Sequence, residues 1–161
     1  MKRLIIMRHG QAASVFGYED KKRPLTKQGT FDVRSIATQL SEAGVEIDLA
    51  IVSSALRTKQ SIESFVEEDR YQELPIKYSD SLYLAGFDEL LSTIAEYADT
   101  VETVLWLGHN PGVSEVATSL SQSFHAFQPA DVLIIENELN DWVESLCGQT
   151  WKKIRSFSPI S

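Results

Sequence analysis

The sequence predicts an α/β fold, a three-layer sandwich with a mostly parallel central sheet and helices on both faces. Short apolar runs alternate with longer segments whose apolar residues recur at helical spacing, which is typical of crossover units. Several of these runs contain no polar residue, as expected for strands buried on both faces. With 161 residues and 43% hydrophobic content, the chain is long enough for one hydrophobic core and too short for two ordinary domains. Residues 1–161 are therefore expected to form a single domain.

The first elements follow from apolar runs and capping residues. A buried strand is expected over 4–7, and the polar segment 11–23 that follows it is expected to be a loop over the strand end. Thr26 is suited to cap an amphipathic helix over 26–43 that ends at Gly44. The apolar residues at helical spacing in this segment are Phe31, Val33, Ile36, Ala37 and Leu40.

The next unit repeats the pattern. A second strand is expected over 48–53, followed by a helix over 55–68 that carries Arg57 in its first turn. The short alternating run 75–78 indicates a weak strand near a sheet edge. The apolar face of the helix consists of Ile62, Phe65 and Val66.

The remaining elements continue the alternation, and the last strand is expected to be antiparallel. In order they are a loop over 80–86, a helix over 88–97 with Leu90, Leu91 and Ile94 inward, a strand over 103–107, a helix that begins at Pro111, a strand over 131–138, one or two helical turns within 140–146, and a strand over 150–157.

Composition limits the classes of partner. The formal net charge of −8 argues against nucleic-acid binding, which depends on many Lys and Arg residues. The chain contains no apolar run long enough to span a bilayer, and its N-terminal apolar run is too short for a signal peptide, so we expect a cytoplasmic protein without membrane contact. The single cysteine, Cys147, excludes an internal disulfide and is expected to be packed or half-exposed.

Basic and imidazole side chains follow three of the expected strands. Arg8 and His9 follow the first, Arg57 comes shortly after the second, and His109 follows the strand over 103–107. The carboxyl ends of neighbouring parallel strands face the crevice where ligands bind in open α/β sheets. Two guanidinium groups with two imidazoles suit a tetrahedral phosphate, because arginine pairs bidentately with its oxygens and stays charged.

The motifs that carry these residues resemble the histidine phosphatase (phosphoglycerate mutase-like) superfamily. They are Met7-Arg8-His9-Gly10, Ser53-Ser54-Ala55-Leu56-Arg57-Thr58 and Gly108-His109-Asn110-Pro111-Gly112. The short chain and Arg23-Pro24-Leu25-Thr26, followed by Gly29, are similar to its small SixA-type phosphohistidine phosphatases. The resemblance spans nearly the whole chain.

The resemblance implies a role for each residue. His9 would attack phosphorus as a neutral imidazole and form a phosphohistidine intermediate that water hydrolyses. Arg8 and Arg57 would bind the phosphoryl oxygens, and His109, if protonated, would donate to another. Arg23 is a substrate-side candidate. No metal and no cofactor are expected, because no cluster of potential ligands has metal-binding spacing.

An expected glutamate is missing. Superfamily members that act on phosphate esters usually carry a glutamate general acid in the region that corresponds to 79–86, where this chain has Tyr83. Whether an acid from 80–89 donates a proton stays open. An imidazole leaves far more readily than an alkoxide. A site with only a weak general acid therefore favours a phosphoramidate substrate. The implied partner is a phosphohistidine-bearing signalling protein such as a phosphotransfer domain. The protein itself is expected to be a monomer.

Two other functions stay open: a phosphatase for a small phosphoester metabolite, and a catalytically idle phosphate-binding module. Individual residues also have alternatives. Arg57 would otherwise pair with Glu63 or an acidic loop, and His109 would otherwise be a satisfied core histidine. Gln11 and Ser14 lie close behind the first strand in sequence, while His125 is expected to be structural.

Overall fold

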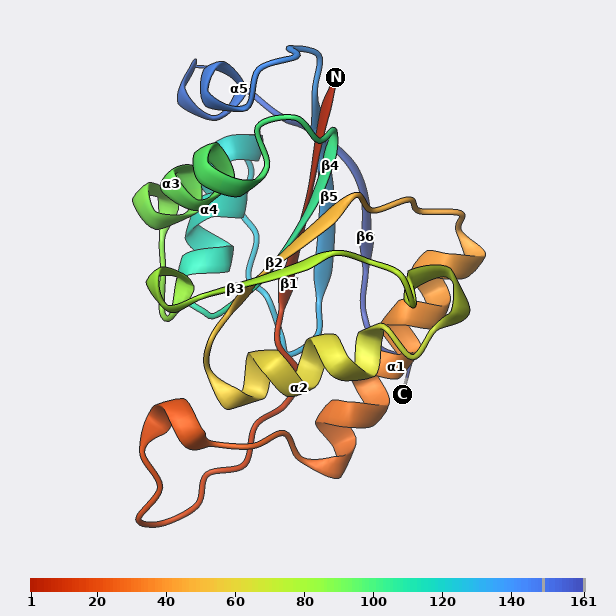
Figure 1. Ribbon diagram of the computed structural model, residues 1–161, viewed down its shortest axis with the longest axis vertical. Coiled ribbons are helices and arrows are strands. Elements are labelled where there is room, and N and C mark those ends of the chain that lie inside the picture. The colour runs from red at the N-terminus through yellow and green to blue at the C-terminus, as the bar shows by residue number, and fades with distance from the viewer. Residues whose placement is uncertain (149, 161) are drawn as a thin grey trace.

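The computed structural model describes residues 1–148 and 150–160, and its order of elements is the expected α/β alternation (Figure 1). The strands are β1 Lys2–Arg8, β2 Leu49–Ser53, β3 Ile76–Ser79, β4 Thr103–Gly108, β5 Val132–Asn137 and β6 Lys152–Phe157. The α-helices are α1 Lys27–Glu42, α2 Leu56–Phe65, α3 Phe87–Tyr97, α4 Gly112–Ser121 and α5 Trp142–Gly148. Short 3-10 turns occupy Asp20–Lys22, Asp69–Tyr71 and Asp80–Leu82.

One six-stranded mixed sheet has the order β3-β2-β4-β1-β5-β6. The pairs from β3 to β1 are parallel, whereas β5 runs antiparallel to β1 and β6 antiparallel to β5. The antiparallel direction expected for the last strand is therefore confirmed, and so is the edge position of β3. Strands β2, β4 and β1 are neighbours, so their carboxyl ends lie together at one edge of the sheet.

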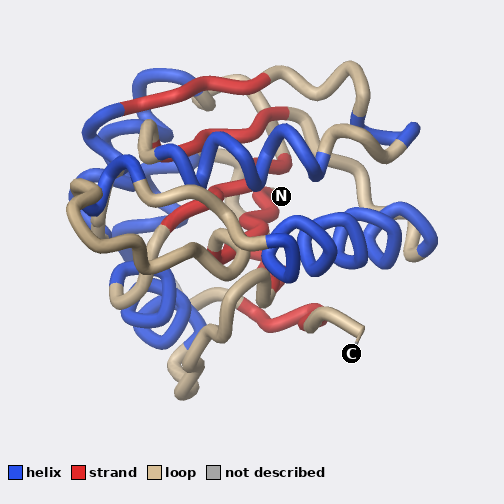
Figure 2. The backbone as a smooth tube through the Cα atoms, turned by 90° about the horizontal axis from the view of Figure 1, so that it is seen from below, coloured by secondary structure: helices blue, strands red, loops and turns tan. Residues whose placement is uncertain are grey.

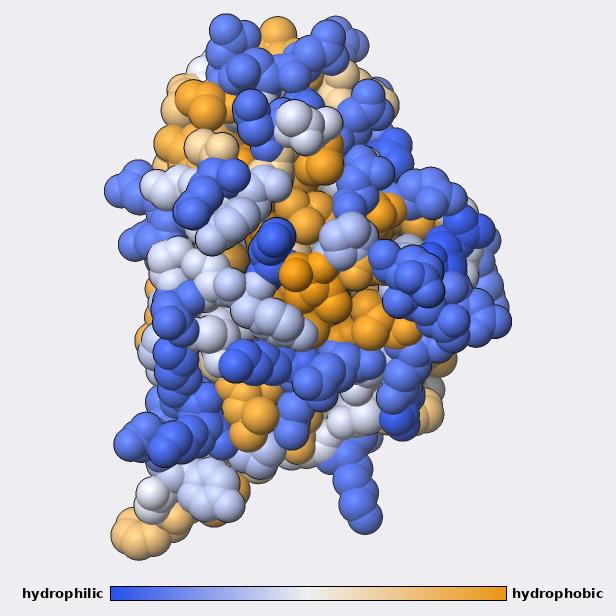
Figure 3. Space-filling model, viewed as in Figure 1, coloured by the Kyte–Doolittle hydropathy of each residue, from blue (hydrophilic) through white to orange (hydrophobic). Residues whose placement is uncertain are grey.

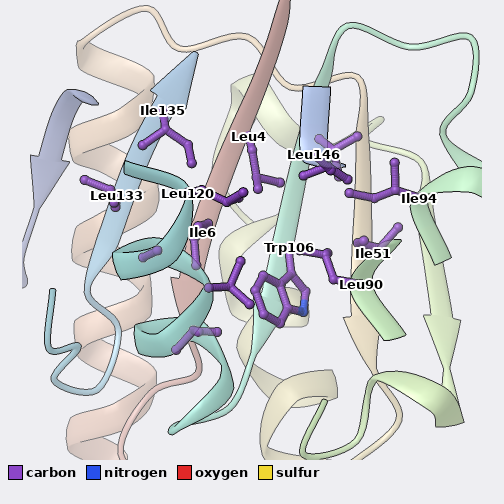
Figure 4. Packing of buried hydrophobic residues seen from close by; sticks show 14 of the residues in the cluster. Leu4, Ile6, Ile51, Leu90, Ile94, Trp106, Leu120, Leu133, Ile135 and Leu146 are labelled. Atoms are coloured by element: carbon purple, nitrogen blue, oxygen red, sulfur yellow. The ribbon is translucent and has the colours of Figure 1, made fainter. Parts of the chain in front are cut away.

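The helices lie on both sides of the sheet, which confirms the three-layer architecture (Figure 2). Alternate residues of β1 enter different cores because successive side chains of a strand point to opposite faces. Leu4 and Ile6 pack with Trp106 under α3, α4 and α5 (Figure 4), whereas Ile5 and Met7 pack under α1 and α2. These four residues of β1 have no exposed surface, as expected for a central strand.

Helix α1 packs against the segment that follows β1. Thr26 caps the helix, since its side-chain oxygen accepts a hydrogen bond from Gly29 N–H at 2.9 Å. A Cβ atom at Gly10 would lie 2.7 Å from Gly29 O, so a side chain at position 10 would push α1 away from the end of β1. The glycine after the Arg8-His9 pair is therefore needed for close packing.

Three expectations were wrong: the burial of Phe31, the end of helix α2 and the burial of Cys147. Phe31 is 59% exposed because its position lies off the buried stripe of α1 formed by Val33, Ile36, Ala37 and Leu40. Helix α2 ends at Phe65, three residues early, because the chain turns into the 3-10 segment Asp69–Tyr71 and buries Tyr71 against Phe65. Cys147 is exposed, since it lies on the outer side of α5.

None of the described helices is both long and apolar enough to cross a bilayer.

Candidate active site

The side chains that follow β1, β2 and β4 gather around one cavity. It has a volume of about 400 Å³ and lies at the shared carboxyl edge of these three strands. The sheet topology thus brings together residues far apart in the sequence, such as Arg8 and His109, which are 101 positions apart. The lining residues are Arg8, His9, Gln11, Ala12, Asp20, Arg23, Arg57, Leu84, His109, Asn110 and Pro129.

His9 has one ring nitrogen fixed and the other facing a cation. Its Nδ1 lies 2.6 Å from Gly10 O, and since a carbonyl oxygen only accepts, Nδ1 carries the proton. Nε2 is then the lone-pair nitrogen, and it accepts from Arg57 Nε at 3.2 Å. Burial, assisted by Arg57 and Arg8, lowers the pKa of His9 to about 4, so the ring is neutral near pH 7. This is the tautomer and charge state that a nucleophilic imidazole requires.

His109 is more deeply buried, with 1% of its surface exposed. Its Nε2 lies 2.8 Å from Ser53 Oγ, which itself accepts from Ala55 N–H at 3.3 Å. Among the described residues the Ser53 hydroxyl has no acceptor other than Nε2, so its proton points to Nε2 and the His109 proton lies on Nδ1. Within the described residues Nδ1 has no hydrogen-bond partner. This buried N–H can therefore donate to an oxygen that enters the cavity.

The sequence analysis gave His109 a donor role if its ring is protonated, and in the free site the ring is neutral. Burial, with the neighbouring His9 and Arg57, lowers the pKa of His109 to about 3. The imidazole is accordingly neutral, and it can donate through Nδ1–H without an added proton. The two imidazoles pack edge to face, with ring centroids 5.3 Å apart.

Arg57 is buried to 3% exposure in the first turn of α2, as predicted, and each of its three nitrogens donates a hydrogen bond. Nε donates to His9, while Nη1 and Nη2 donate to the backbone oxygen and the carboxylate of Asp20 at 2.7 and 3.0 Å. The expected alternative of a pairing with an acidic loop is thus observed, with Asp20 rather than Glu63. The same side chain also faces the cavity, so the two interpretations do not exclude one another.

Arg8 lines the cavity, and one of its guanidinium nitrogens is bound to the backbone. Its Nη1 donates to Phe127 O at 2.9 Å, and its Nε is buried without a partner in the described part of the chain. Burial lowers the pKa of Arg8 below its usual value, while Asp131 opposes the shift. Arg23 lies at the rim, where its Nε donates to Ala13 O at 2.9 Å and its Nη1 to Asp20 at 3.0 Å.

Asp20 was missed by the sequence reasoning. Its carboxylate accepts from Arg57, Arg23 and the Tyr83 hydroxyl, and these donors hold its pKa far below the ordinary value, the Tyr83 hydrogen bond most of all. The spacing of Asp20 and Arg23 at i, i+3 was a usable signal, because it pairs an acid with the arginine of a recognised motif. Ser53 was noted only as a strand-end hydroxyl, and its contact with His109 requires the sheet register.

Some candidates lie outside this cluster. Ser14 is exposed and does not line the cavity, whereas Gln11 does. His125 lies in the loop before β5, where its ring contacts Ser123, and it does not line this cavity. Among residues 1–148 and 150–160, no three His, Cys, Asp or Glu side chains are grouped so that they could bind a metal ion.

The histidine pKa values predict an unusual titration. Between pH 5.5 and 8, His9 and His109 should show no inflection in their imidazole proton NMR shifts, because burial holds both pKa values near 4 and 3. An unfolded chain takes up these protons near its ordinary pKa of 6.5, so the free energy of unfolding should decrease as the pH falls from 6.5 toward 4.

Spectra of His9→Ala and His109→Ala would assign the two resonances. A midpoint between pH 6 and 7 for either ring would contradict the prediction.

Comparison with known proteins places this geometry in a family. Phosphohistidine phosphatase SixA of Escherichia coli is 41% identical over 115 residues, which are 70% of this chain and 63% of that protein. The solved protein histidine phosphatase SixA complexed with tungstate is 25% identical, with a TM-score of 0.77 and coverage of 98% and 97%. The chain belongs to the histidine phosphatase superfamily. It resembles the SixA-type members of that superfamily, which are phosphatase hydrolases.

Other members of the histidine phosphatase superfamily share the fold with less sequence similarity. A SixA-type protein from Nakamurella multipartitia has a TM-score of 0.82 at 22% identity, with coverage of 99% and 97%. A mycobacterial glucosyl-3-phosphoglycerate phosphatase has a TM-score of 0.68 at 14% identity, with coverage of 94% and 96%. No family model matches the chain. The fold alone therefore does not distinguish a protein substrate from a small molecule.

Proposed function

We propose that the protein hydrolyses phosphohistidine on a partner protein, with His9 as the nucleophile. Arg57 Nε–H would pass from His9 Nε2 to a phosphoryl oxygen, which frees the Nε2 lone pair. Nε2 would then attack phosphorus while the bond from phosphorus to the substrate imidazole breaks, and that imidazole takes a proton from solvent. Water would then attack the phosphorylated His9, which releases inorganic phosphate and restores the neutral ring. Arg8, Arg57 and His109 Nδ1–H would bind the phosphoryl oxygens as their charge develops.

The arrangement around His9 is the observation that carries the proposal. A buried imidazole has Nδ1 fixed by Gly10 O, so Nε2 keeps its lone pair on the side where Arg57 lies. A phosphoryl group bound by Arg57 would be adjacent to that lone pair. A binding module that only recognises phosphate has no need for this tautomer, whereas nucleophilic attack depends on it.

The rim of the cavity supports a phosphoramidate rather than an ester. Asp20 is the carboxylate that lines the cavity, and three donors hold it ionised, so it has no proton to give an alkoxide. Tyr83 donates its hydroxyl proton to Asp20, and this hydrogen bond raises the pKa of Tyr83. An imidazole leaving group has a conjugate acid with a pKa of about 6.5 and needs no such acid.

The surroundings of the cavity fit a substrate carried on a folded protein. Leu84 and Asp20 at the rim are exposed, and residues 11–23 form a projecting loop beside it (Figure 1). A side chain on a partner's surface can therefore reach His9 without being enclosed. A phosphotransfer domain is the partner class with this chemistry, and a monomeric enzyme in the cytoplasm would meet it there.

Steady-state kinetics on two substrates test the proposal. We expect kcat/KM for a phosphohistidine-bearing phosphotransfer domain to exceed that for p-nitrophenyl phosphate and sugar phosphates by at least about a hundredfold, because the ester leaving groups lack a proton donor. Comparable or higher turnover of a small phosphoester would favour the metabolite phosphatase. Absence of turnover together with tight phosphate binding would favour the idle module.

A further inference from the structure

We propose that Asp20 is an internal competitor of the phosphoryl group: it occupies donors of Arg57 that a bound phosphate needs, and phosphate binding displaces it. The inference rests on the assignment of Arg57 to the phosphoryl oxygens in the proposed function. It adds a residue that weakens the affinity of the site for free phosphate.

The competition is inferred from the contacts of Arg57. Two of its three nitrogens donate to Asp20, one to the carboxylate and one to the backbone oxygen, and the third donates to His9. A phosphoryl group next to His9 Nε2 would approach the same guanidinium. Two anions cannot share one buried cation without mutual repulsion, so the carboxylate and the phosphate compete for it.

Asp20 is also held so that it can return. When Arg57 is taken by phosphate, the carboxylate still has Arg23, 3.0 Å away, and the Tyr83 hydroxyl as donors. Its side chain is 46% exposed against 4% for Arg57, so water can also compensate a displaced carboxylate. The displacement therefore exchanges one set of hydrogen bonds for another.

The loop that carries Asp20 is suited to such a movement. It projects from the body of the molecule at the lower left of Figures 1 and 3, and Phe16 within it is fully exposed. Between residues 14–22 and the rest of the described chain, the hydrogen bonds are those that Asp20 accepts and the one that Lys21 donates to Asp80 at 3.2 Å. Few contacts have to break when the carboxylate moves.

The competition has a consequence for turnover. Hydrolysis of the phosphoenzyme leaves inorganic phosphate on Arg8 and Arg57, and a carboxylate that returns to Arg57 would favour its release. A phosphorylated partner protein would overcome the same competition with contacts outside the cavity. Asp20 thus discriminates against free phosphate.

Titration calorimetry with inorganic phosphate tests the inference without any turnover. We expect Asp20→Asn and Asp20→Ala to lower the Kd for phosphate by about tenfold, because one competing charge-assisted hydrogen bond is worth on the order of a decade in affinity. Asp80→Asn is the matched control. It removes the same charge from the partner of Lys21 without a contact to Arg57, and it should change Kd by less than about twofold.

The outcomes separate the two proposals. If wild type binds phosphate and Asp20→Asn binds it equally or more weakly, Asp20 positions Arg57 and the competition is wrong. An equal gain in Asp80→Asn would also overturn it, because net charge alone would then explain the effect. If neither wild type nor any variant binds phosphate, the phosphate site itself fails. Thermal unfolding of each variant verifies that the exposed loop substitutions leave the fold intact.

Discussion

Replacing His9 with alanine should reduce kcat/KM for the phosphohistidine protein by at least about a thousandfold and should abolish the phosphoenzyme. The ring supplies the attacking lone pair, and Arg57, its hydrogen-bond partner at 3.2 Å, is a guanidinium that cannot act as a nucleophile in its place. Rapid quenching with a phosphorylated substrate, followed by detection of alkali-stable, acid-labile phosphate on the enzyme, measures the intermediate. Stability should change far less than activity, because His9 lies at the edge of the core.

The matched control is His125→Ala. This histidine lies in the loop before β5 and lines a different cavity, so its loss should leave the rate and the phosphoenzyme unchanged. Equal rates for wild type and His9→Ala would remove the proposed nucleophile. A phosphoenzyme that survives in His9→Ala would show that a different side chain carries the phosphoryl group.

Arg57→Ala and Arg57→Lys should both reduce kcat/KM by roughly a hundredfold or more, on the order of 3 kcal/mol in the barrier. Lysine keeps the charge, but its single ammonium cannot place three donors at the positions now taken by His9 and the two oxygens of Asp20. Steady-state kinetics of the two variants provides the measurement, with phosphate affinity as a second readout.

Arg34 offers a matched control for these substitutions. It is a helix arginine in an exposed pair with Glu67, at 2.6 Å, and it has no contact with the cavity. Arg34→Lys should leave kcat/KM within about twofold of wild type, since exposed ion pairs contribute little. Full activity in Arg57→Lys would show that a positive charge at this position is sufficient for catalysis. The donor geometry of the guanidinium would then not be required.

Several features of the fold could be predicted because they depend on local pattern. The uninterrupted apolar run of β1 indicated burial on both faces, and all four residues from Leu4 to Met7 are fully buried. Helix α1 begins after Thr26, where a capping oxygen indicated it. Phe31 shows the limit of the pattern, because an apolar residue slightly off the stripe of a helix is left in solvent.

The convergence of the candidate residues was also predictable, although their contacts were not. Arg8 ends β1, whereas His9, Arg57 and His109 follow β1, β2 and β4, and the carboxyl ends of these parallel neighbours lie at one edge of the sheet. The contribution of Asp20 depends on how a loop of polar residues folds back over Arg57. The sequence pattern of 11–23 does not predict this loop conformation, because the loop is positioned by hydrogen bonds to distant side chains.

By itself the sequence determined the α/β fold, the place of the basic and imidazole groups at strand ends, and the family resemblance, because alternation and motif order are written along the chain. Only the tertiary structure decided which nitrogen of His9 and of His109 carries the proton, and that both rings are neutral. It alone placed a carboxylate on Arg57. The physical reason is that tautomers, pKa values and ion pairs depend on burial and on partners that are remote in sequence.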